Sequence, residues 1–334
     1  MRRRLFLAGL MATACRPAES NLASPKALDV KRLDREITAL ADQARPGILG
    51  VGVMDLPTVQ TWALNGERPF PMQSVFKAPL GAAVLAEVDA GRLNLAETVT
   101  LKEENLSPPY SPIADAWPIT DTYSYQDLLV RAVGGSDNTA ADVLMKRIGG
   151  PGAVQAWLEL KGIKGVRIDR YEREIQTDMY GMASFRAAWK GEIYRQMHDA
   201  VPPQVRYAAT LKYLSDPRDT ATPRGMLDFL SHLVSSQLIS NASLARLLAI
   251  MTAATTGQNR LKAGLPPGAT IAHKSGTSGT DLDLTPATND VGVVTLKGGR
   301  QLAVAVFLTA SRADLGAREH LIAEVMRAIV RSVK

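Results

Sequence analysis

The segment QSVFKAPLGAAVLAEV, residues 73–88, decides how the rest of the chain is interpreted, because it stands between short β-like runs and a long helical region. Its apolar residues predict a buried helix that begins at Ser74. Lys77 follows three positions later, and residues three apart share one face of a helix, so a hydroxyl and an amine would lie side by side. The same pair also fits a helix cap beside a solvated lysine. Only the other motifs of the sequence separate these two interpretations.

The elements on either side of this segment predict a fold in two parts. Before this segment, the sequence predicts an amphipathic helix and then two short strands, GILGVGVMDL and QTWALN. From about residue 264, three more strand-like stretches lead into a long amphipathic helix, with a hairpin turn at Gly298 and Gly299. We expect residues 28–70 and 264–334 to form an α/β sandwich, one antiparallel sheet flanked by helices and built from both chain ends. Residues 71–263, mostly helical in pattern, are expected to form an all-α domain.

The composition indicates a folded globular protein, since 46% of the 334 residues are hydrophobic and 22% are charged. Three of the six surplus positive charges are Arg2, Arg3 and Arg4. No basic cluster is interleaved with aromatic residues, so we expect no nucleic-acid partner. The four histidines are far apart in the sequence, which argues against a metal site. A single cysteine excludes an intramolecular disulfide.

The first residues, MRRRLFLAGLMATAC, have the layout of an export signal, with a cationic start, an apolar run and a small-residue cleavage site. We expect residues 1–14 to be the signal peptide and residues 15–27 a linker. Two interpretations of Cys15 stay open, namely lipid attachment after cleavage, or plain signal-peptidase cleavage nearby. The protein is therefore expected to be exported to the periplasm, with a membrane anchor only under the first interpretation.

Two further motifs place reactive side chains at the edges of predicted elements. Ser-Asp-Asn at residues 136–138 comes just before a helix, where a serine or an aspartate often serves only as a cap. Lys-Ser-Gly-Thr at residues 274–277 lies on a predicted strand that runs into a glycine-rich turn. Each motif is ordinary when taken singly. Their order along the chain, after the pair Ser74 and Lys77, is not.

In this order, Ser-x-x-Lys, Ser-Asp-Asn and Lys-Ser-Gly are the signature of class A β-lactamases and penicillin-binding proteins. The sequence resembles the class A serine β-lactamases from about residue 30 to the C-terminus, in segments such as YSPIADAWPIT, RIDRYEREIQ and DPRDTATP. The resemblance implies a β-lactamase/transpeptidase-like fold. It also implies hydrolysis of β-lactam antibiotics through a serine acyl-enzyme. We expect no metal or cofactor, and a monomer is the default expectation for the oligomeric state, which the sequence leaves open.

The resemblance assigns the chemistry to four side chains. Ser74 is the nucleophile, Lys77 is a candidate base in a crowded cationic site, and Ser136 passes a proton towards the departing nitrogen. Glu172, in RYEREIQ, matches the general base that drives water into the acyl-enzyme. Without the other motifs it would be interpreted as an exposed loop glutamate. Whether Glu172 or Lys77 activates the serine during acylation is disputed for the family.

Other residues match substrate-binding positions of the family. The backbone N–H groups of Ser74 and Thr277 would form an oxyanion hole. Arg260 matches an arginine that binds the substrate carboxylate in some members, although a surface arginine at a helix end is the alternative. Thr277 also belongs to the substrate-binding set, whose other members are Asn138, Lys274, Ser275 and the rim residue Tyr110.

Three positions depart from the family pattern. Gln176 stands where an asparagine commonly helps the glutamate to hold the deacylation water, and it is one methylene longer. Arg173 replaces a frequent proline, so a cis bond before it would be a costly non-proline cis bond. Gln73 and Ser278 occupy positions that form a disulfide in some carbapenem-hydrolysing relatives, so that bridge is absent.

The largest departure is an insertion. Arg170 and Asp219 match an ion pair that closes the loop carrying the base, yet they are far more widely separated in this sequence than in the family. The omega-type loop is thus expected over residues 170–219, with an insertion over about 178–214. Because the insertion contains aromatic, amphipathic stretches, we expect it to fold into short helices over the loop and to alter access to the cleft.

The sequence therefore predicts an exported serine β-lactamase. The nearest alternative is a penicillin-binding protein or D,D-peptidase that acts on cell-wall peptides, which would share the other motifs and differ at Glu172. A second alternative, a non-catalytic exported binding protein, is disfavoured because a decayed enzyme is expected to have lost at least one of the catalytic residues.

Overall fold

The computed structural model describes residues 27–183, 186 and 188–333. The predicted signal peptide, Cys15 and nearly all of the predicted linker therefore lie outside the described residues. Within them, no helix has the length and apolarity that a membrane crossing requires.

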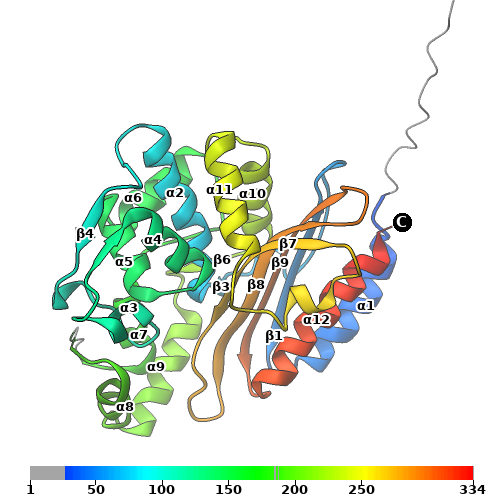
Figure 1. Cartoon of the computed structure of the whole chain (residues 1–334). Helices are drawn as coiled ribbons and strands as arrows, with labels where there is room; N and C mark the ends of the chain where they lie inside the picture. The colour runs from blue at the N-terminus through cyan, green and yellow to red at the C-terminus, as the bar shows by residue number, and fades with distance from the viewer. Residues whose placement is uncertain (1–26, 184–185, 187, 334) are drawn as a thin grey trace, which may run out of the picture.

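The centre of the molecule is a five-stranded sheet in the order β2-β1-β9-β8-β7 (Figure 1). Every neighbouring pair is antiparallel, and β1 from the start of the chain pairs with β9 from its end, Val51 opposite Val306. Gly298 and Gly299 form the turn between β8 and β9, with φ of +99° and +88°. The expectation of one antiparallel sheet built from both chain ends is confirmed. The strands are β1 (Ile48–Asp55), β2 (Gln60–Leu64), β7 (Thr270–Thr277), β8 (Thr285–Thr295) and β9 (Gln301–Ser311).

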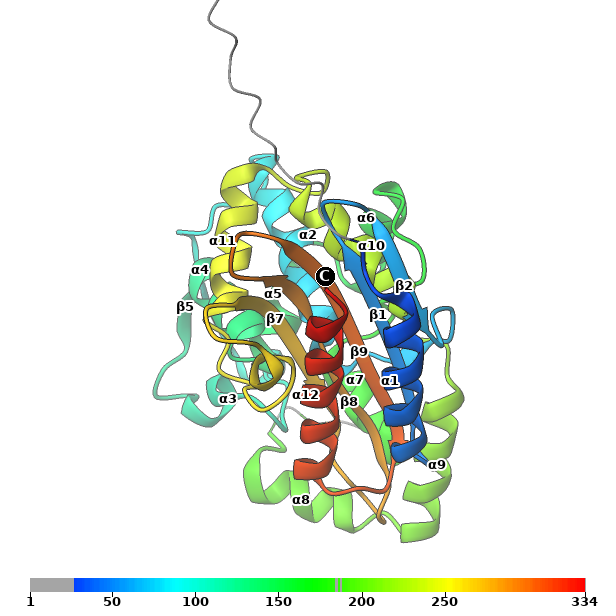
Figure 2. The ribbon, with the colours of Figure 1, turned by 90° about the vertical axis from the view of Figure 1, so that its right-hand side faces the viewer.

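Two helices cover one face of this sheet, α1 (Val30–Gln43) and α12 (Leu315–Ser332), and they lie side by side in Figure 2. Leu33 and Ile37, four residues apart on α1, are fully buried against the sheet, as a helical apolar stripe requires. α12 contributes Met326 and Ile329 to the same core. The terminal helices thus bury the outer face of the sheet, as the amphipathic patterns predict.

The other face packs against the helical part of the chain (Figure 1). α2 is buried on every side from Lys77 to Leu85, which explains why its sequence is apolar all round rather than striped. α10 packs directly on β1 and β9. The helices of this part are α2 (Lys77–Asp89), α3 (Pro112–Ala116), α4 (Tyr125–Leu129), α5 (Asn138–Arg147), α6 (Pro151–Leu160), α7 (Glu172–Tyr180), α8 (Gly191–Asp199), α9 (Pro203–Ser215), α10 (Pro223–Val234) and α11 (Asn241–Thr252).

This part is not entirely helical, which corrects the expectation of an all-α segment. β4 (Thr98–Thr100) pairs with β5 (Thr122–Ser124), and β3 (Phe70–Pro71) pairs with β6 (Thr220–Ala221). The sequences Thr-Val-Thr and Thr-Tyr-Ser favour extended backbone because β-branched and aromatic side chains pack well on a pleated surface. The four strands are only two or three residues long, so they give no recognisable alternation of apolar and polar residues in the sequence.

Candidate active site

Ser74 lies in a 3₁₀ turn, Gln73–Phe76, that leads directly into α2. Gln73 has a φ of +47°, a left-handed conformation that a non-glycine residue adopts only when its surroundings impose it. Its side-chain amide donates to the Tyr213 hydroxyl at 2.6 Å and lies 3.7 Å from the sulfur of Met179. The strained residue before the serine is thus fixed by side chains of α7 and α9.

Lys77 is completely buried beside the serine, one turn further along the chain. Its ammonium group donates to Ser74 Oγ at 3.0 Å, to the Ser136 carbonyl at 2.9 Å and to Asn138 Oδ1 at 2.6 Å. It also forms an ion pair with Glu172 Oε1 at 2.9 Å. The amine therefore joins the serine to the Ser-Asp-Asn motif and to Glu172, and it is not a solvated lysine.

The Ser-Asp-Asn motif follows a π-helical turn, Val130–Gly134, a form often found at functional sites. Ser136 has a φ of +63°, which turns its carbonyl to Lys77 and its hydroxyl to Lys274 Nζ, 3.0 Å away. Asp137 caps α5 through the amide of Ala140 at 2.9 Å. The capping interpretation is therefore right for Asp137, whereas Ser136 faces the two lysines.

Lys274 lies on β7 and is also completely buried. Its ammonium group donates to Ser136 Oγ at 3.0 Å and to the Ser275 carbonyl at 2.8 Å. Burial, and then the positive charge of Lys77, hold the pKa of Lys274 well below its usual range. Two positions on, a Cβ on Gly276 would lie 2.4 Å from the Met72 carbonyl oxygen, so only glycine lets β7 approach the turn of Ser74 this closely.

Glu172 is the first residue of α7, and only 2% of it is exposed. Its Oε1 lies 3.4 Å from Ser74 Oγ, and its Oε2 accepts from Gln176 Nε2 at 3.4 Å. Its backbone amide donates to Asp142 Oδ1 at 2.8 Å. The interpretation as an exposed loop glutamate is therefore wrong. Cis peptide bonds of the described residues all precede prolines, so the bond between Glu172 and Arg173 is trans.

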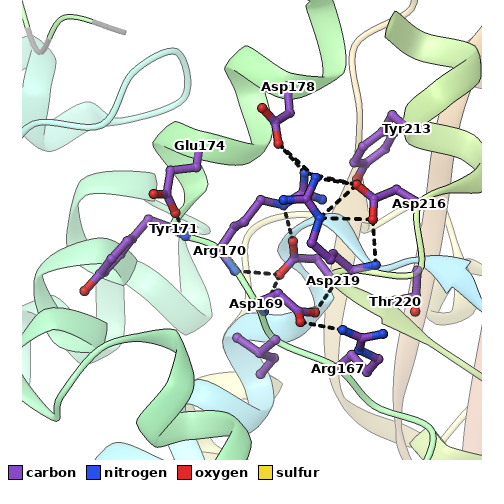
Figure 3. A network of polar contacts seen from close by, with 12 residues as sticks. Arg167, Asp169, Arg170, Tyr171, Glu174, Asp178, Tyr213, Asp216, Asp219 and Thr220 are labelled. Atoms are coloured by element: carbon purple, nitrogen blue, oxygen red, sulfur yellow. Dashed lines mark hydrogen bonds and ion pairs between the residues drawn. The ribbon is translucent and has the colours of Figure 1, made fainter. Parts of the chain in front are cut away.

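The loop that carries Glu172 is closed by a cluster of ion pairs (Figure 3). Arg170 Nε lies 2.6 Å from Asp219 Oδ2, and Arg170 Nη1 lies 2.6 Å from Asp178 Oδ2. Asp219 Oδ1 also accepts from the backbone amides of Asp169 and Arg170, at 2.7 and 3.1 Å. The pair expected from the sequence is therefore in contact, and Asp178 and Arg218 of the insertion and its end extend it.

The insertion forms α8, α9 and the end of α7, as short helices were expected to do. These elements share a small core that includes Met179, Tyr180 and Tyr194. They are also tied to the turn between β7 and β8, because Arg206 Nε lies 2.8 Å from Asp281 Oδ2. His198 Nε2 approaches the same carboxylate at 3.8 Å. The inserted helices thus bridge from the omega-type loop to the sheet.

These groups meet in a cleft of about 440 Å³. Eight residues predicted from the sequence line it, whereas Lys77, Lys274 and Arg260 lie buried behind its wall. Residues of the insertion, among them Tyr194 and His198, line the same cavity. The eight predicted lining residues are Ser74, Tyr110, Ser136, Asn138, Glu172, Gln176, Ser275 and Thr277.

The chain that builds this cleft is similar in sequence to known β-lactamases. A model of the "Beta-lactamase enzyme family" matches residues 32–333. The chain belongs to this β-lactamase family. It is 33% identical to "Extended-spectrum beta-lactamase PER-1" of Pseudomonas aeruginosa, over 83% of this chain and 80% of that protein. It is 30% identical to "Beta-lactamase VEB-1" of the same organism, over 85% of each.

Solved structures place this β-lactamase in class A. An ancestral class A β-lactamase superposes with a TM-score of 0.73 at 34% identity, covering 90% of this chain and 99% of that one. A β-lactamase from Chitinophaga pinensis superposes with a TM-score of 0.75 at 32% identity, with the same coverage. The serine β-lactamase assignment and its fold are therefore confirmed.

Arg260 of this β-lactamase is not the surface arginine of the alternative interpretation, and its role toward the substrate carboxylate stays a prediction. It is 3% exposed, and it does not line the cleft. Its Nε pairs with Glu319 at 3.1 Å, and its Nη2 donates to Thr277 Oγ1 at 2.7 Å. Arg260 therefore reaches the cleft through the threonine hydroxyl.

Sequence reasoning missed two residues that position this site. Asp142 is fully buried on α5 and accepts from the amide of Glu172, from Ser107 Oγ at 2.6 Å and from Arg173 Nε at 3.3 Å. Burial raises the pKa of its carboxyl group. The available signal was an acidic residue within the apolar run Ala-Ala-Asp-Val-Leu. The second is Tyr213, the partner of Gln73, which carries no local signal at all.

Proposed function

We propose that this β-lactamase opens β-lactam rings through an acyl-enzyme on Ser74, with Glu172 as the base of the hydrolytic step. One observation carries the proposal, namely that Ser74 Oγ lies 3.0 Å from Lys77 Nζ and 3.4 Å from Glu172 Oε1, at the wall of the cleft. A serine hydroxyl is a weak nucleophile, and it becomes effective when a base removes its proton during attack.

In the acylation step, Ser74 Oγ attacks the carbonyl carbon of the ring. The proton of the hydroxyl passes to Glu172, or to Lys77 after Lys77 has given one of its own protons to Glu172, whose Oε1 is 2.9 Å away. The carbonyl oxygen becomes an oxyanion, which the backbone N–H groups of Ser74 and Thr277 stabilise. The carbon–nitrogen bond then breaks, and Ser136 gives the departing nitrogen a proton that Lys274 resupplies. Lys274 Nζ lies 3.0 Å from Ser136 Oγ, whereas Lys77 contacts only the backbone carbonyl of Ser136 among the atoms of that residue.

In the deacylation step, Glu172 takes a proton from water as the water attacks the ester carbon. The ester bond breaks, and Ser74 Oγ receives the proton that Glu172 took from the water, which leaves Glu172 as a carboxylate again. Gln176 supports this step because its amide lies 3.4 Å from Glu172 Oε2 and also lines the cleft. The amide group that holds the water is therefore kept, although the longer side chain moves it relative to an asparagine.

The rest of the cleft binds the substrate. Ser275 and Thr277 supply hydroxyl donors for its carboxylate, and the charges of Lys274 and Arg260 reinforce them from behind the wall. Asn138 faces the amide side chain of the substrate, and Tyr110, which is 53% exposed, stands at the rim. The inserted helices alter access from the other end of the cleft, where Tyr194 and His198 lie.

The protein acts after export, in the periplasm. The support is the signal-like start of the sequence, with its cationic residues, apolar run and small-residue cleavage site. Lipid attachment at Cys15 and plain cleavage remain the two alternatives. Mass spectrometry of the mature N-terminus separates them, because only the first adds acyl chains to the cysteine.

The replacement Glu172→Ala tests the assignment of the base. Mixing the variant with a chromogenic cephalosporin should open about one ring per molecule and leave an adduct on Ser74 in the mass spectrum. The reason is that Ser74 can still be acylated, whereas the acyl-enzyme is no longer hydrolysed. The natural chain should open hundreds. Glu103→Gln, on the exposed Glu103, is the matched control and should behave like the natural chain.

Continued turnover by Glu172→Ala would remove Glu172 from the mechanism. Ser74→Ala must form no adduct, and an adduct there would place the nucleophile elsewhere. If the natural chain itself stops after one ring per molecule, the protein behaves as a penicillin-binding enzyme.

A further inference from the structure

A second cavity lies on the side of the sheet that α1 and α12 cover. Figure 2 shows these two helices in front of the sheet. The cavity has a volume of about 260 Å³ and shares no lining residue with the catalytic cleft. The end of α1, the end of β9 and the first turns of α12 surround it. Its charged and hydroxyl-bearing lining residues are Arg45, Ser311, Arg312, Arg318, His320 and Glu324.

Arg318 distinguishes this cavity from an ordinary surface hollow. Four arginines are buried in the described part of the chain, and three of them meet a carboxylate: Arg170 meets Asp219, Arg206 meets Asp281, and Arg260 meets Glu319. Arg318 is 4% exposed and forms no ion pair within the described residues. A buried charge without a counter-charge is costly, so it calls for an explanation.

The hydrogen bonds of Arg318 use only part of its guanidinium group. Its Nη1 donates to Thr285 Oγ1 and to the Ala313 carbonyl, each at 2.6 Å. Its Nε is buried and has no hydrogen-bond partner among the described residues. Burial, and then the positive charge of Arg260, lower the pKa of Arg318, as expected for a cation that lacks compensation.

The acidic groups near Arg318 are engaged elsewhere. Asp314 caps α12 by accepting from Ala317 N at 2.8 Å, and Glu319 holds Arg260 at 3.1 Å. Glu324 is the one carboxylate that lines the cavity, and it pairs with both Arg327 and His320. Asp314 and Glu319 favour the charge of Arg318 from a distance, but none of these carboxylates forms an ion pair with it within the described residues.

Further positive charge lies at the mouth of the same cavity. Arg312 is exposed and makes no hydrogen bond or ion pair with the described residues. Arg45 pairs with Asp42 at 3.1 Å, but both side chains are more than half exposed, so the pair is weak. The lining therefore carries an excess of positive charge that the protein's own carboxylates do not satisfy.

We propose that this cavity binds a small oxyanion, with inorganic phosphate as the model ligand, between Arg312 and Arg318. The guanidinium group suits such a ligand because its planar N–H groups match the geometry of carboxylate and phosphate oxygens. The bound anion would neutralise the buried charge where α1, β9 and α12 meet. Because it binds only the folded chain, it would also raise the melting temperature.

A phosphate titration of the ¹⁵N-labelled protein, followed by NMR, tests the proposal site by site. Sodium chloride keeps the ionic strength constant, and backbone amides of residues 311–318 report on the cavity. Amides of Ser74 and Thr277 report separately on any phosphate in the catalytic cleft. We expect saturable shifts at residues 311–318 at low millimolar phosphate, together with a higher melting temperature.

Two variants and a control make the test specific. Arg318→Gln removes the buried charge, and Arg312→Gln, at an exposed position that leaves the fold intact, should weaken phosphate binding about tenfold by removing a charge-assisted contact. Arg92→Gln, at an exposed arginine far from the cavity, should leave binding unchanged. Shifts that never saturate, or that persist equally in Arg312→Gln and Arg318→Gln, would overturn the proposal.

Discussion

Lys77 and Lys274 are both completely buried and differ in what surrounds them. Lys77 meets a carboxylate at 2.9 Å, that of Glu172. Among the described residues, the ammonium group of Lys274 donates to a hydroxyl and a carbonyl and forms no ion pair. Taking an ion out of water costs several kcal/mol unless a counter-charge and hydrogen bonds compensate. At the scale of single residues, the cleft therefore holds one compensated cation and one that costs stability.

Replacing Lys274 with methionine should stabilise the fold by about 1 kcal/mol or more, because it removes the desolvation cost of the cation. The same change should lower kcat/KM, because it removes positive charge from behind the substrate-binding wall. Urea titrations and steady-state kinetics measure the two effects. The exposed Lys31→Met is the control, with neither effect expected.

The gain in stability from Lys274→Met should also depend on pH. The pKa of Lys274 is lowered in the folded chain, so above that lowered pKa the unfolded chain binds more protons and stability rises with pH. The cost of the lysine is thus full below the folded pKa and shrinks as the pH rises towards the ordinary lysine value. A difference between variant and natural chain that grows with pH would contradict this account.

At the scale of elements, the inserted helices and the turn between β7 and β8 hold each other in place. Arg206 on α9 and Asp281 in the turn are only 10% and 12% exposed, so their ion pair is largely shielded from water. Tyr180 at the end of α7 packs on His198 of α8, with ring centroids 4.6 Å apart. These contacts form one end wall of the catalytic cleft.

Arg206→Gln should loosen this wall and lower the free energy of unfolding by about 1–3 kcal/mol, because it leaves Asp281 partly buried without its main partner. Once the wall is loose, the ratio of kcat/KM for bulky over small β-lactams should rise. Asp281→Asn should add little to Arg206→Gln, since both break the same pair. Arg45→Gln, which breaks an exposed pair with Asp42 and does not line the catalytic cleft, is the matched control. An unchanged ratio would show that the insertion does not control access.

At the scale of the whole molecule, one sheet separates two hydrophobic cores. Successive side chains of a strand point to opposite faces. On β9, Phe307 therefore belongs to the core shared with the helical part, where it stacks on Phe70 with ring centroids 5.7 Å apart. Its neighbour Val306 belongs to the core under α1 and α12. Because both cores need the same strand, we expect them to unfold together.

Phe307→Ala should cost about 3–5 kcal/mol, and Val306→Ala about 2 kcal/mol, each by removing a fully buried side chain. Each should shift a single calorimetric transition in which the measured and van't Hoff enthalpies agree. Two transitions, of which each variant moves only one, would mean that the cores are independent. The exposed Val59→Ala should leave the melting temperature nearly unchanged.

The sequence by itself determined the sheet built from both chain ends. Amphipathic periods and turn residues are local properties, so they can be recognised within a single segment without knowledge of its partners. The sequence also determined the identity of the motif residues, since their order is typical of class A β-lactamases and penicillin-binding proteins. Arg170 and Asp219 were predicted as a pair on the same basis, and their side chains are in contact.

The tertiary structure alone decided how those residues are held. Gln73 meets Tyr213 across 140 positions and Lys274 meets Ser136 across 138, and no local pattern encodes a contact over such a separation. The burial of Arg260 and the uncompensated charge of Arg318 depend in the same way on helix α12 closing over the sheet. Local periodicity says which face of an element is apolar, but the partners of a buried polar group are set by where distant segments pack.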